Sequence, residues 1–190
     1  MPWASQEETL LLAQAMRERC FRYGEFRLTS GGTSRYYYDG KQVTLHPRWA
    51  ELIGRLLLEP VLAWGAQGVG GMATGAIPIA MAVALAALRY ASQELMVFYV
   101  RQSPKGHGVQ DEVSGGEMIK GLPVAILEDV VTTGASSLRA IEAVEALGCL
   151  VVGVATIVER HEGGGTEIRR RGYPFFRLFH TDEGGQLHLG

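Results

Sequence analysis

The stretch VAILEDVVTTGASS, residues 124–137, decides the fold class of this chain. Residues 123–127 form a short apolar run typical of a buried strand, and two adjacent carboxylates, Glu128 and Asp129, follow it directly. A turn of small residues comes next, and residues 136–147 repeat apolar side chains at the spacing of a helix. A strand, a polar turn and a helix in this order are typical of one unit of a parallel α/β sheet.

The alternation of strands and helices continues on both sides of this stretch. Apolar runs predict strands at 65–70, 94–100, 150–158 and 174–179, and helical spacing predicts helices at 5–20, from 47 to about 57, 76–90 and 166–171. Ser5 with Glu8 three residues later predicts a capping box at the first helix. Fully apolar strands between helices indicate an open, mostly parallel sheet with helices on both faces. The helix at 76–90 is almost wholly apolar, so we expect it to be buried.

A different composition marks residues 24–46, which are rich in Gly, Ser, Thr and Tyr. This segment predicts small antiparallel strands around a Ser-Gly-Gly turn. We expect a small hood over the sheet, formed from about 21–46 and by 159–172. A length of 190 residues and a mass of 20.7 kDa suit one domain, residues 1–190, that carries both parts.

Composition and charge narrow the function classes. Hydrophobic residues make up 47% and charged residues 20%, with a net charge of −2, so we expect no nucleic-acid partner, because such binders are normally strongly basic. The first residues lack the positive charge of a signal peptide, and the apolar run 77–88 is too short to span a bilayer. We therefore expect a cytoplasmic protein without a membrane partner. Cys20 and Cys149 match no metal spacing and are expected to be buried, reduced thiols.

The turn after the two carboxylates predicts a phosphate site. Small residues from Thr132 to Ser136 leave backbone N–H groups accessible at the start of a helix, and such a terminus attracts a phosphate. Glu128 and Asp129 would repel the phosphate itself, so we expect them to accept hydrogen bonds from ribose hydroxyls or to help hold Mg²⁺. The motif thus predicts a sugar 5-phosphate site; the alternative is an ordinary strand-to-helix connection with a capped helix.

A second polar segment lies between 101 and 116. Arg101, Lys105 and His107 are flanked there by glycines, and three potential cations on a mobile loop suit a transient polyanion. The alternative is a solvated surface loop. Residues 68–73, GVGGMA, formally fit a dinucleotide-binding fingerprint, but Arg101 stands where the acidic ribose ligand of that fingerprint is expected.

Three of these stretches resemble one family. VAILEDVVTTGAS resembles the phosphoribosyl pyrophosphate motif of the type I phosphoribosyltransferases. FRLTSGGTSRYYYDGKQVTLHP resembles the hood of orotate phosphoribosyltransferases, and VFYVRQSPKGHG resembles their flexible catalytic loop. The resemblance runs from about residue 21 to residue 160. It implies the type I phosphoribosyltransferase fold and Mg²⁺-dependent transfer of ribose 5-phosphate from phosphoribosyl pyrophosphate to orotate. The products would be orotidine 5′-monophosphate and pyrophosphate, a reaction of pyrimidine biosynthesis.

The resemblance also implies the roles of individual residues. Catalytic roles fall to Arg101, Lys105, His107 and Asp129. Phosphoribosyl pyrophosphate would be bound by Arg101, Lys105, His107, Glu128, Asp129, Val130, Val131, Thr132, Thr133, Gly134, Ala135 and Ser136. Orotate would be bound by Tyr37, Tyr38, Thr132 and Arg160, the arginine holding the orotate carboxylate. No direct protein metal site is implied beyond Asp129, since Mg²⁺ would come with the substrate.

Some implications leave alternatives. Tyr37 and Tyr38 also fit a plain tyrosine stripe in a strand, and Arg160 also fits a surface arginine paired with Glu159 or Glu162. In the family the loop often serves a neighbouring subunit, so we expect a homodimer with shared active sites.

The sequence departs from the family pattern at three positions. Gln102 stands at the second basic position of the loop, Gly75 stands where some members have lysine, and Thr29 replaces another lysine. Two other functions therefore stay open: a non-catalytic sensor of phosphoribosyl pyrophosphate or a nucleotide, and a phosphoribosyltransferase for another base.

Overall fold

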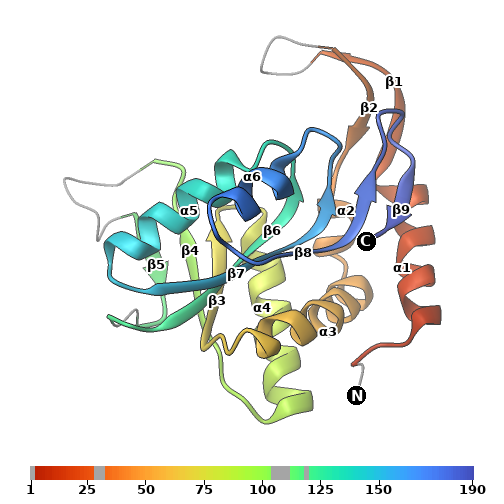
Figure 1. Cartoon of the computed structure of the whole chain (residues 1–190). Coiled ribbons are helices and arrows are strands. Elements are labelled where there is room, and N and C mark those ends of the chain that lie inside the picture. The colour runs from red at the N-terminus through yellow and green to blue at the C-terminus, as the bar shows by residue number, and fades with distance from the viewer. Residues whose placement is uncertain (1–2, 28–32, 104–111, 118–119) are drawn as a thin grey trace.

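The computed structural model describes residues 3–27, 33–103, 112–117 and 120–190, and a seven-stranded sheet forms the centre of this described part (Figure 1). The strand order is β5-β4-β3-β6-β7-β8-β9. The strands are β3 (Gly68–Met72), β4 (Met96–Val100), β5 (Val113–Gly115), β6 (Pro123–Val131), β7 (Leu150–Glu159), β8 (Phe175–Thr181) and β9 (Leu187–Leu189). β3, β4, β6, β7 and β8 run parallel, while β5 and β9 pair antiparallel at the two edges. The expected open, mostly parallel sheet is confirmed.

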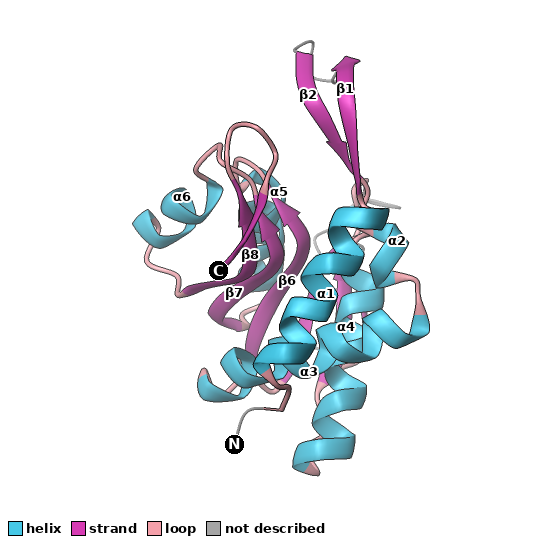
Figure 2. Ribbon diagram, turned by 90° about the vertical axis from the view of Figure 1, so that its right-hand side faces the viewer, coloured by secondary structure: helices cyan, strands magenta, loops and turns pink. Residues whose placement is uncertain are grey.

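Helices cover both faces of this sheet (Figure 2). They are α1 (Gln6–Arg19), α2 (Lys41–Thr44), α3 (Pro47–Ala63), α4 (Ala76–Ala86) with the π-helical turn η1 (Ala87–Ala91), α5 (Ala135–Ala146) and α6 (Gly164–Arg170). Figure 2 shows α1 to α4 on one face and α5 and α6 on the other. Within the described part of the chain, the helices are too short or too polar to span a bilayer.

The apolar pattern of β6 explains why the sheet is covered twice. Val124 and Ile126 belong to the core under α5 and α6, whereas Ala125 and Leu127 belong to the core under α1, α3 and α4. Because successive side chains of a strand point to opposite faces, an uninterrupted apolar run requires packing on both sides. All four side chains are fully buried.

Local signals set several element ends as predicted. The Ser5 Oγ accepts a hydrogen bond from the Glu8 backbone N–H at 3.1 Å, and the Glu8 carboxylate accepts one from the Ser5 N–H at 2.8 Å, so the capping box is confirmed. Gly148 follows α5 with a φ of 83°, a conformation that glycine adopts without steric penalty. Cys20 and Cys149 are buried and form no disulfide with each other, as expected.

The sequence pattern did not predict three short elements, which are the one-turn helix α2 and the edge strands β5 and β9. Segments of three or four residues carry too little periodicity to be recognised. It also ended the central strand at Leu127, but β6 continues to Val131 because β7 pairs with it up to that residue.

The expectation that the helix at 76–90 is buried is wrong for one of its faces. Met81, Leu85 and Leu88 are 45%, 59% and 52% exposed. The opposite face is buried, since Ile79, Ala80 and Val83 are 1%, 0% and 0% exposed. A helix that is apolar all round does not reveal which of its faces lacks a neighbour.

The segment expected as a hood contains a two-stranded antiparallel hairpin, β1 (Phe21–Arg27) and β2 (Thr33–Tyr38). The hairpin projects beyond the sheet in both views (Figures 1 and 2). Its base is anchored by Tyr36, which is 1% exposed and packs against Gly185, between β8 and β9. The other expected hood segment contains α6, which packs against β7 and β8 of the main sheet.

Candidate active site

The expected site residues follow the carboxyl ends of parallel strands, which share one edge of the sheet. The strands end at Met72, Val100, Val131 and Glu159. The segments that follow them are the 73–75 loop, Arg101, the 132–136 turn and Arg160. Ligands of open α/β sheets bind at this edge. The topology therefore brings residues between positions 73 and 160 of the sequence to one edge of the sheet.

A small pocket of about 80 Å³ lies where β6 turns into α5. It is lined by Glu128, Val130, Val131, Thr132, Thr133, Gly134, Ala135, Ser136 and Ser137. Gly134 is the residue before the helix, has a φ of 83° and provides no side-chain cap. The first N–H groups of α5 thus lack a capping side chain from that residue, and they face a polar pocket, as a phosphate site requires.

The two adjacent carboxylates share a strand end but point to opposite faces of the sheet. Glu128 faces α5, where Ser137 Oγ lies 3.5 Å from its Oε2. Asp129 faces the other layer, because a Cβ added to Gly75 would lie 2.6 Å from its Oδ1. The alternation follows from strand geometry. Glu128 therefore lines the phosphate pocket, and Asp129 lies on the other side of β6.

Burial changes the acidity of both carboxyl groups. Glu128 is 6% exposed, and burial together with the neighbouring Asp129 charge raises its pKa to about 8. Burial also raises the pKa of Asp129, opposed by hydrogen bonds from the Val130 and Asp129 backbone N–H groups. Unpaired carboxylates at a strand end are costly without a ligand, so their presence points to a binding partner.

Two glycines hold the Asp129 side chain between them. A Cβ on Gly75 would overlap its carboxylate at 2.6 Å, and a Cβ on Gly40 would lie 3.3 Å from its Oδ2 and 3.0 Å from the Tyr38 hydroxyl. The Tyr38 hydroxyl is buried and has no hydrogen-bond partner among the described residues. The segment after the hairpin therefore closes directly over Asp129.

On the other side of the site, Arg160 follows β7. Its side chain is 13% exposed and pairs with Glu162 at 3.1 Å, which is one of the two alternative partners considered from the sequence. Its guanidinium also lies over the Tyr36 ring, 4.6 Å from the centroid, and its buried Nε has no hydrogen-bond partner among the described residues. A guanidinium can bind a planar carboxylate through two parallel N–H donors, so an arginine positioned by a ring and an ion pair at this edge is suited to such a ligand.

The other alternative partner, Glu159, is engaged elsewhere. This carboxylate is 5% exposed, accepts a hydrogen bond from Gly165 N–H at 2.9 Å and forms a close ion pair with Arg177. It ties the start of α6 to β7 and β8. Gly164 lies next to it and is packed against the phosphate turn, since a Cβ there would be 2.7 Å from both Gly134 N and the Thr132 carbonyl oxygen.

The two tyrosines expected at the base site point in different directions. Tyr37 is 45% exposed, with its ring 5.8 Å from that of Phe26. Tyr38 packs toward the core, with its ring 5.1 Å from that of Phe21. Adjacent residues of a strand cannot share a face. Tyr36, which lies under Arg160, was not predicted from the sequence. Alternate residues of a strand share a face, so the sequence does predict that Tyr36 lies on the same side as Tyr38.

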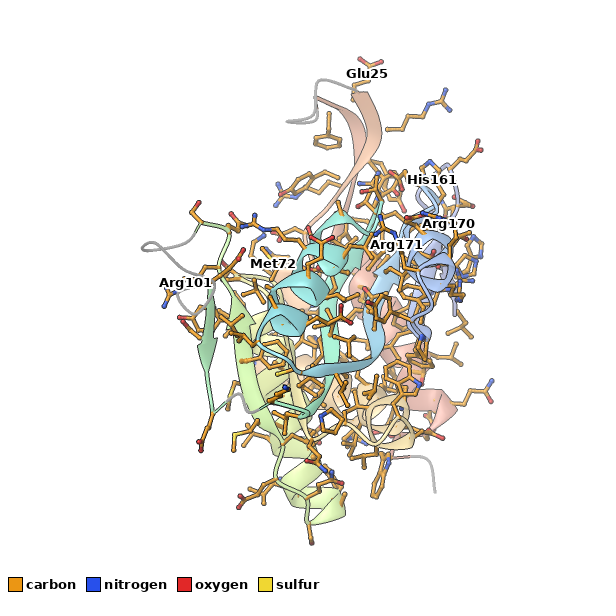
Figure 3. All side chains as sticks on the ribbon, turned by 60° about the vertical axis from the view of Figure 1, so that its left-hand side comes forward. Glu25, Met72, Arg101, His161, Arg170 and Arg171 are labelled. Atoms are coloured by element: carbon orange, nitrogen blue, oxygen red, sulfur yellow. The ribbon has the colours of Figure 1, made fainter. Side chains whose placement is uncertain are left out.

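The loop cations are described only in part. Arg101 Nη2 donates to Ser114 Oγ at 2.8 Å, and the guanidinium lies 5.4 Å from the centre of the Tyr99 ring. Figure 3 shows Arg101 and His161, the neighbour of Arg160, on opposite sides of α5 in that view. Lys105 and His107 lie outside the described residues, as does Thr29.

Comparison with known proteins agrees with this geometry. The phosphoribosyl transferase domain family matches residues 40–176, which include β6, the phosphate turn and Arg160. The orotate phosphoribosyltransferase of Aquifex aeolicus is 41% identical over 175 residues, which cover 90% of this chain and 94% of that protein.

Solved structures agree as well. A crystal structure of the orotate phosphoribosyltransferase of Mycobacterium tuberculosis superposes with a TM-score of 0.81 at 36% identity and covers 94% of this chain and 99% of that one. A second crystal structure of the same enzyme, in complex with phosphoribosyl pyrophosphate, gives a TM-score of 0.75 at 30% identity over 95% of this chain and 93% of that one. The fold and site thus define a type I phosphoribosyltransferase. Within that class, the chain belongs to the orotate phosphoribosyltransferase family.

Proposed function

We propose that the protein transfers the 5-phosphoribosyl group of phosphoribosyl pyrophosphate to N1 of orotate, in the presence of Mg²⁺. The new bond joins N1 of the orotate anion to ribose C1, and the C1–oxygen bond to pyrophosphate breaks with its electron pair leaving on pyrophosphate. The observation that carries the proposal is the pairing of a phosphate pocket with Arg160, whose guanidinium carbon lies 4.6 Å from the centre of the Tyr36 ring at the same edge of the sheet. Orotate has a carboxylate for this arginine, whereas uracil has none.

The chain's own residues then have separate tasks. The N–H groups at the start of α5 bind the 5-phosphate, and Glu128 and Asp129 orient the ribose from the end of β6. The positive charge that develops on ribose C1 in the transition state is stabilised by the neighbouring carboxylates. Arg101, Lys105 and His107 neutralise the departing pyrophosphate. Because orotate brings its own nucleophile, the protein needs only to position the reactants.

The residues fit Mg²⁺ only as a substrate-borne ion. Among the described residues there is no group of three or more His, Cys, Asp or Glu side chains that could hold a metal. Mg²⁺ is commonly held by one or two carboxylates together with substrate phosphates and waters. Asp129 and the oxygens of phosphoribosyl pyrophosphate would hold it here. When bound, the ion supplies positive charge to the pyrophosphate.

A direct assay tests the reaction. Orotate absorbance should fall when the protein is mixed with orotate, phosphoribosyl pyrophosphate and Mg²⁺, and pyrophosphate should appear in equal amount. Turnover of hypoxanthine, adenine or uracil, but not of orotate, would assign the protein to another base. Tight binding of phosphoribosyl pyrophosphate in calorimetry, without pyrophosphate release, would indicate a sensor. A cytoplasmic location remains a prediction.

We also propose that the protein acts as a homodimer through the exposed face of α4. A groove of about 710 Å³ runs between α3 and α4, and its rim carries Leu45, Met81, Leu85 and Leu88, all exposed. Contiguous exposed apolar surface of this kind is typical of an interface. A second copy suits it, because a twofold contact presents the same apolar patch from both sides. Leu85→Glu should convert the dimer to a monomer in analytical ultracentrifugation.

Shared sites have their own test. Arg160→Ala and Lys105→Ala damage different parts of the site, so each variant alone should be much less active than the parent at an orotate concentration near the parent's KM. If the loop of one subunit serves the other, mixing the two variants should restore part of the activity. Sites formed within one chain would give no recovery on mixing.

A further inference from the structure

Lys41 lies near Asp129, close enough for the two charges to interact. It belongs to the hood stretch FRLTSGGTSRYYYDGKQVTLHP, but the sequence assigned it no role. It directly follows Gly40, whose backbone packs against the Asp129 carboxylate. A Cβ atom added to Gly40 would lie only 3.3 Å from Oδ2 of Asp129. Its ammonium pairs with Asp39 at 2.9 Å, and 60% of its side chain is exposed. The cation is therefore placed by the fold at the entrance to Asp129 and remains accessible to a ligand.

Asp39 has the contacts of a positioning residue. Its backbone N–H donates to the Cys20 carbonyl at 2.9 Å, which ties it to the base of the hairpin. Its carboxylate also accepts a hydrogen bond from the Gln42 side chain at 3.1 Å. The pKa of Asp39 is lowered by its hydrogen bonds from Lys41 and Gln42 despite some burial, so the pair stays charged at neutral pH.

The face of Asp129 is the one on which a diphosphate would lie. The 5-phosphate pocket is on the opposite side of β6, where Glu128 and α5 meet. On the Asp129 side, Ala73 N–H donates to the Val100 carbonyl at 2.7 Å, so the 73–75 loop lies next to Arg101, an expected cation for the leaving group. No side chain fits at Gly75 without displacing Asp129.

We propose that Lys41 is a further substrate-binding residue, which contacts the diphosphate of phosphoribosyl pyrophosphate from the hood side and is oriented by Asp39. This inference rests on the proposed function for the identity of the ligand. The hood then contributes to the sugar-phosphate side of the site as well as to the base side. A charge-assisted contact from an ammonium to a phosphate oxygen would also offset the repulsion between the diphosphate and the nearby carboxylates of Asp39 and Asp129.

Lys41→Gln tests the proposal, with Lys120→Gln as the matched control. Lys120 is the other lysine among the described residues and packs beside Gly148, away from the site. Calorimetry without any base should show the Kd of Mg²⁺-phosphoribosyl pyrophosphate raised about tenfold in Lys41→Gln and unchanged in Lys120→Gln. Lys41→Arg should recover most of the affinity. In turnover assays the KM for phosphoribosyl pyrophosphate should rise likewise, while the orotate KM and the thermal midpoint stay close to those of the parent.

The outcomes separate the two proposals. An unchanged Kd in Lys41→Gln would overturn the inference and show that Lys41 forms only a surface ion pair with Asp39. A raised Kd in a protein that binds phosphoribosyl pyrophosphate but does not turn over orotate would support Lys41 and overturn the orotate assignment. A parent protein that does not bind phosphoribosyl pyrophosphate would overturn both.

Discussion

The phosphate side and the base side of the site are built in different ways. The phosphate side is one continuous segment, residues 128–137, in which a strand end, a turn and a helix start follow one another. The base side joins Tyr36 of the hairpin, Arg160 after β7 and Gly185 between β8 and β9. The first is set by local backbone geometry and the second by tertiary packing. Substitutions on the base side should therefore change base recognition and leave phosphate binding intact.

The two sides of the site also differ in how their buried carboxylates are neutralised. Glu159, on the base side, is neutralised by Arg177 and by the Gly165 N–H. Among the described residues, Glu128 on the phosphate side has the Ser137 hydroxyl at 3.5 Å as its one hydrogen-bond partner, and a like charge, Asp129, lies next to it. The Glu159 carboxylate of the base side is thus satisfied in the free protein, whereas the Glu128 carboxylate of the phosphate side gains its partners when substrate binds.

The largest effect is expected for Arg160→Ala. An orotate carboxylate left without its arginine loses roughly 2–5 kcal/mol, so the orotate KM should rise on the order of 10²-fold or more. The KM for phosphoribosyl pyrophosphate should barely move. Steady-state kinetics with each substrate varied in turn measures both values. Arg170→Ala, an exposed arginine of α6 bonded to Glu167, is the control. An unchanged orotate KM in Arg160→Ala would remove the basis for an orotate site.

The stability of the free protein should reveal the unsatisfied carboxylate of the phosphate side. The Glu128 pKa is raised to about 8 from 4.5, so the folded state holds this proton more tightly than the unfolded state. Its contribution to the free energy of unfolding is therefore lost as pH rises from about 4.5 to about 8. Glu128→Gln should remove that loss and stabilise the free protein by roughly 3 kcal/mol at pH 7, with no difference near pH 4.

Urea unfolding at several pH values measures this effect. Glu8→Gln is a control of opposite sign, because its hydrogen bonds from Arg55 lower the Glu8 pKa to about 2. That variant should lose stability above pH 4. Equal pH profiles for Glu128→Gln and the parent would show that Glu128 is ionised in the free protein at no cost.

Asp129→Asn should have a smaller effect than Arg160→Ala, and it should change the KM of the other substrate. Loss of one carboxylate beside the reacting carbon should lower kcat and raise the KM for phosphoribosyl pyrophosphate, each by about tenfold. The orotate KM should stay within about twofold of the parent. Asp182→Asn, an exposed carboxylate between β8 and β9, serves as the control. If the KM for orotate rises together with the KM for phosphoribosyl pyrophosphate, the two sides of the site are not separable.

The difference between the sides also explains what the sequence could predict. The phosphate turn is readable because carboxylates, small residues and a helix start are contiguous in residues 128–136. The core pattern of β6 and the cap at Ser5 are equally local. Tyr36 and Arg160 are in contact although more than 120 residues separate them in the sequence, and no local sequence pattern predicts such a contact. The exposed face of α4 was missed for a related reason, since an apolar sequence does not tell which neighbour is absent.

The smallest change in orotate KM is expected for substitutions of Tyr36. They test whether tertiary packing positions the base side of the site. Its ring lies under the Arg160 guanidinium at 4.6 Å, and its hydroxyl is within hydrogen-bond distance of Thr181 Oγ1 at 3.1 Å. Tyr36→Leu removes the ring but leaves the ion pair of Arg160 with Glu162, so Arg160 should be only partly displaced and the orotate KM should rise about three- to fivefold, which corresponds to about 0.6–1 kcal/mol. Tyr36→Phe keeps the ring and loses only the hydroxyl, so it should bind orotate like the parent while losing some thermal stability. If both variants raise the orotate KM equally, the hydroxyl contact to β8 and not the ring positions Arg160. If neither does, Arg160 is held by Glu162 alone, and the base side is as local in construction as the phosphate side.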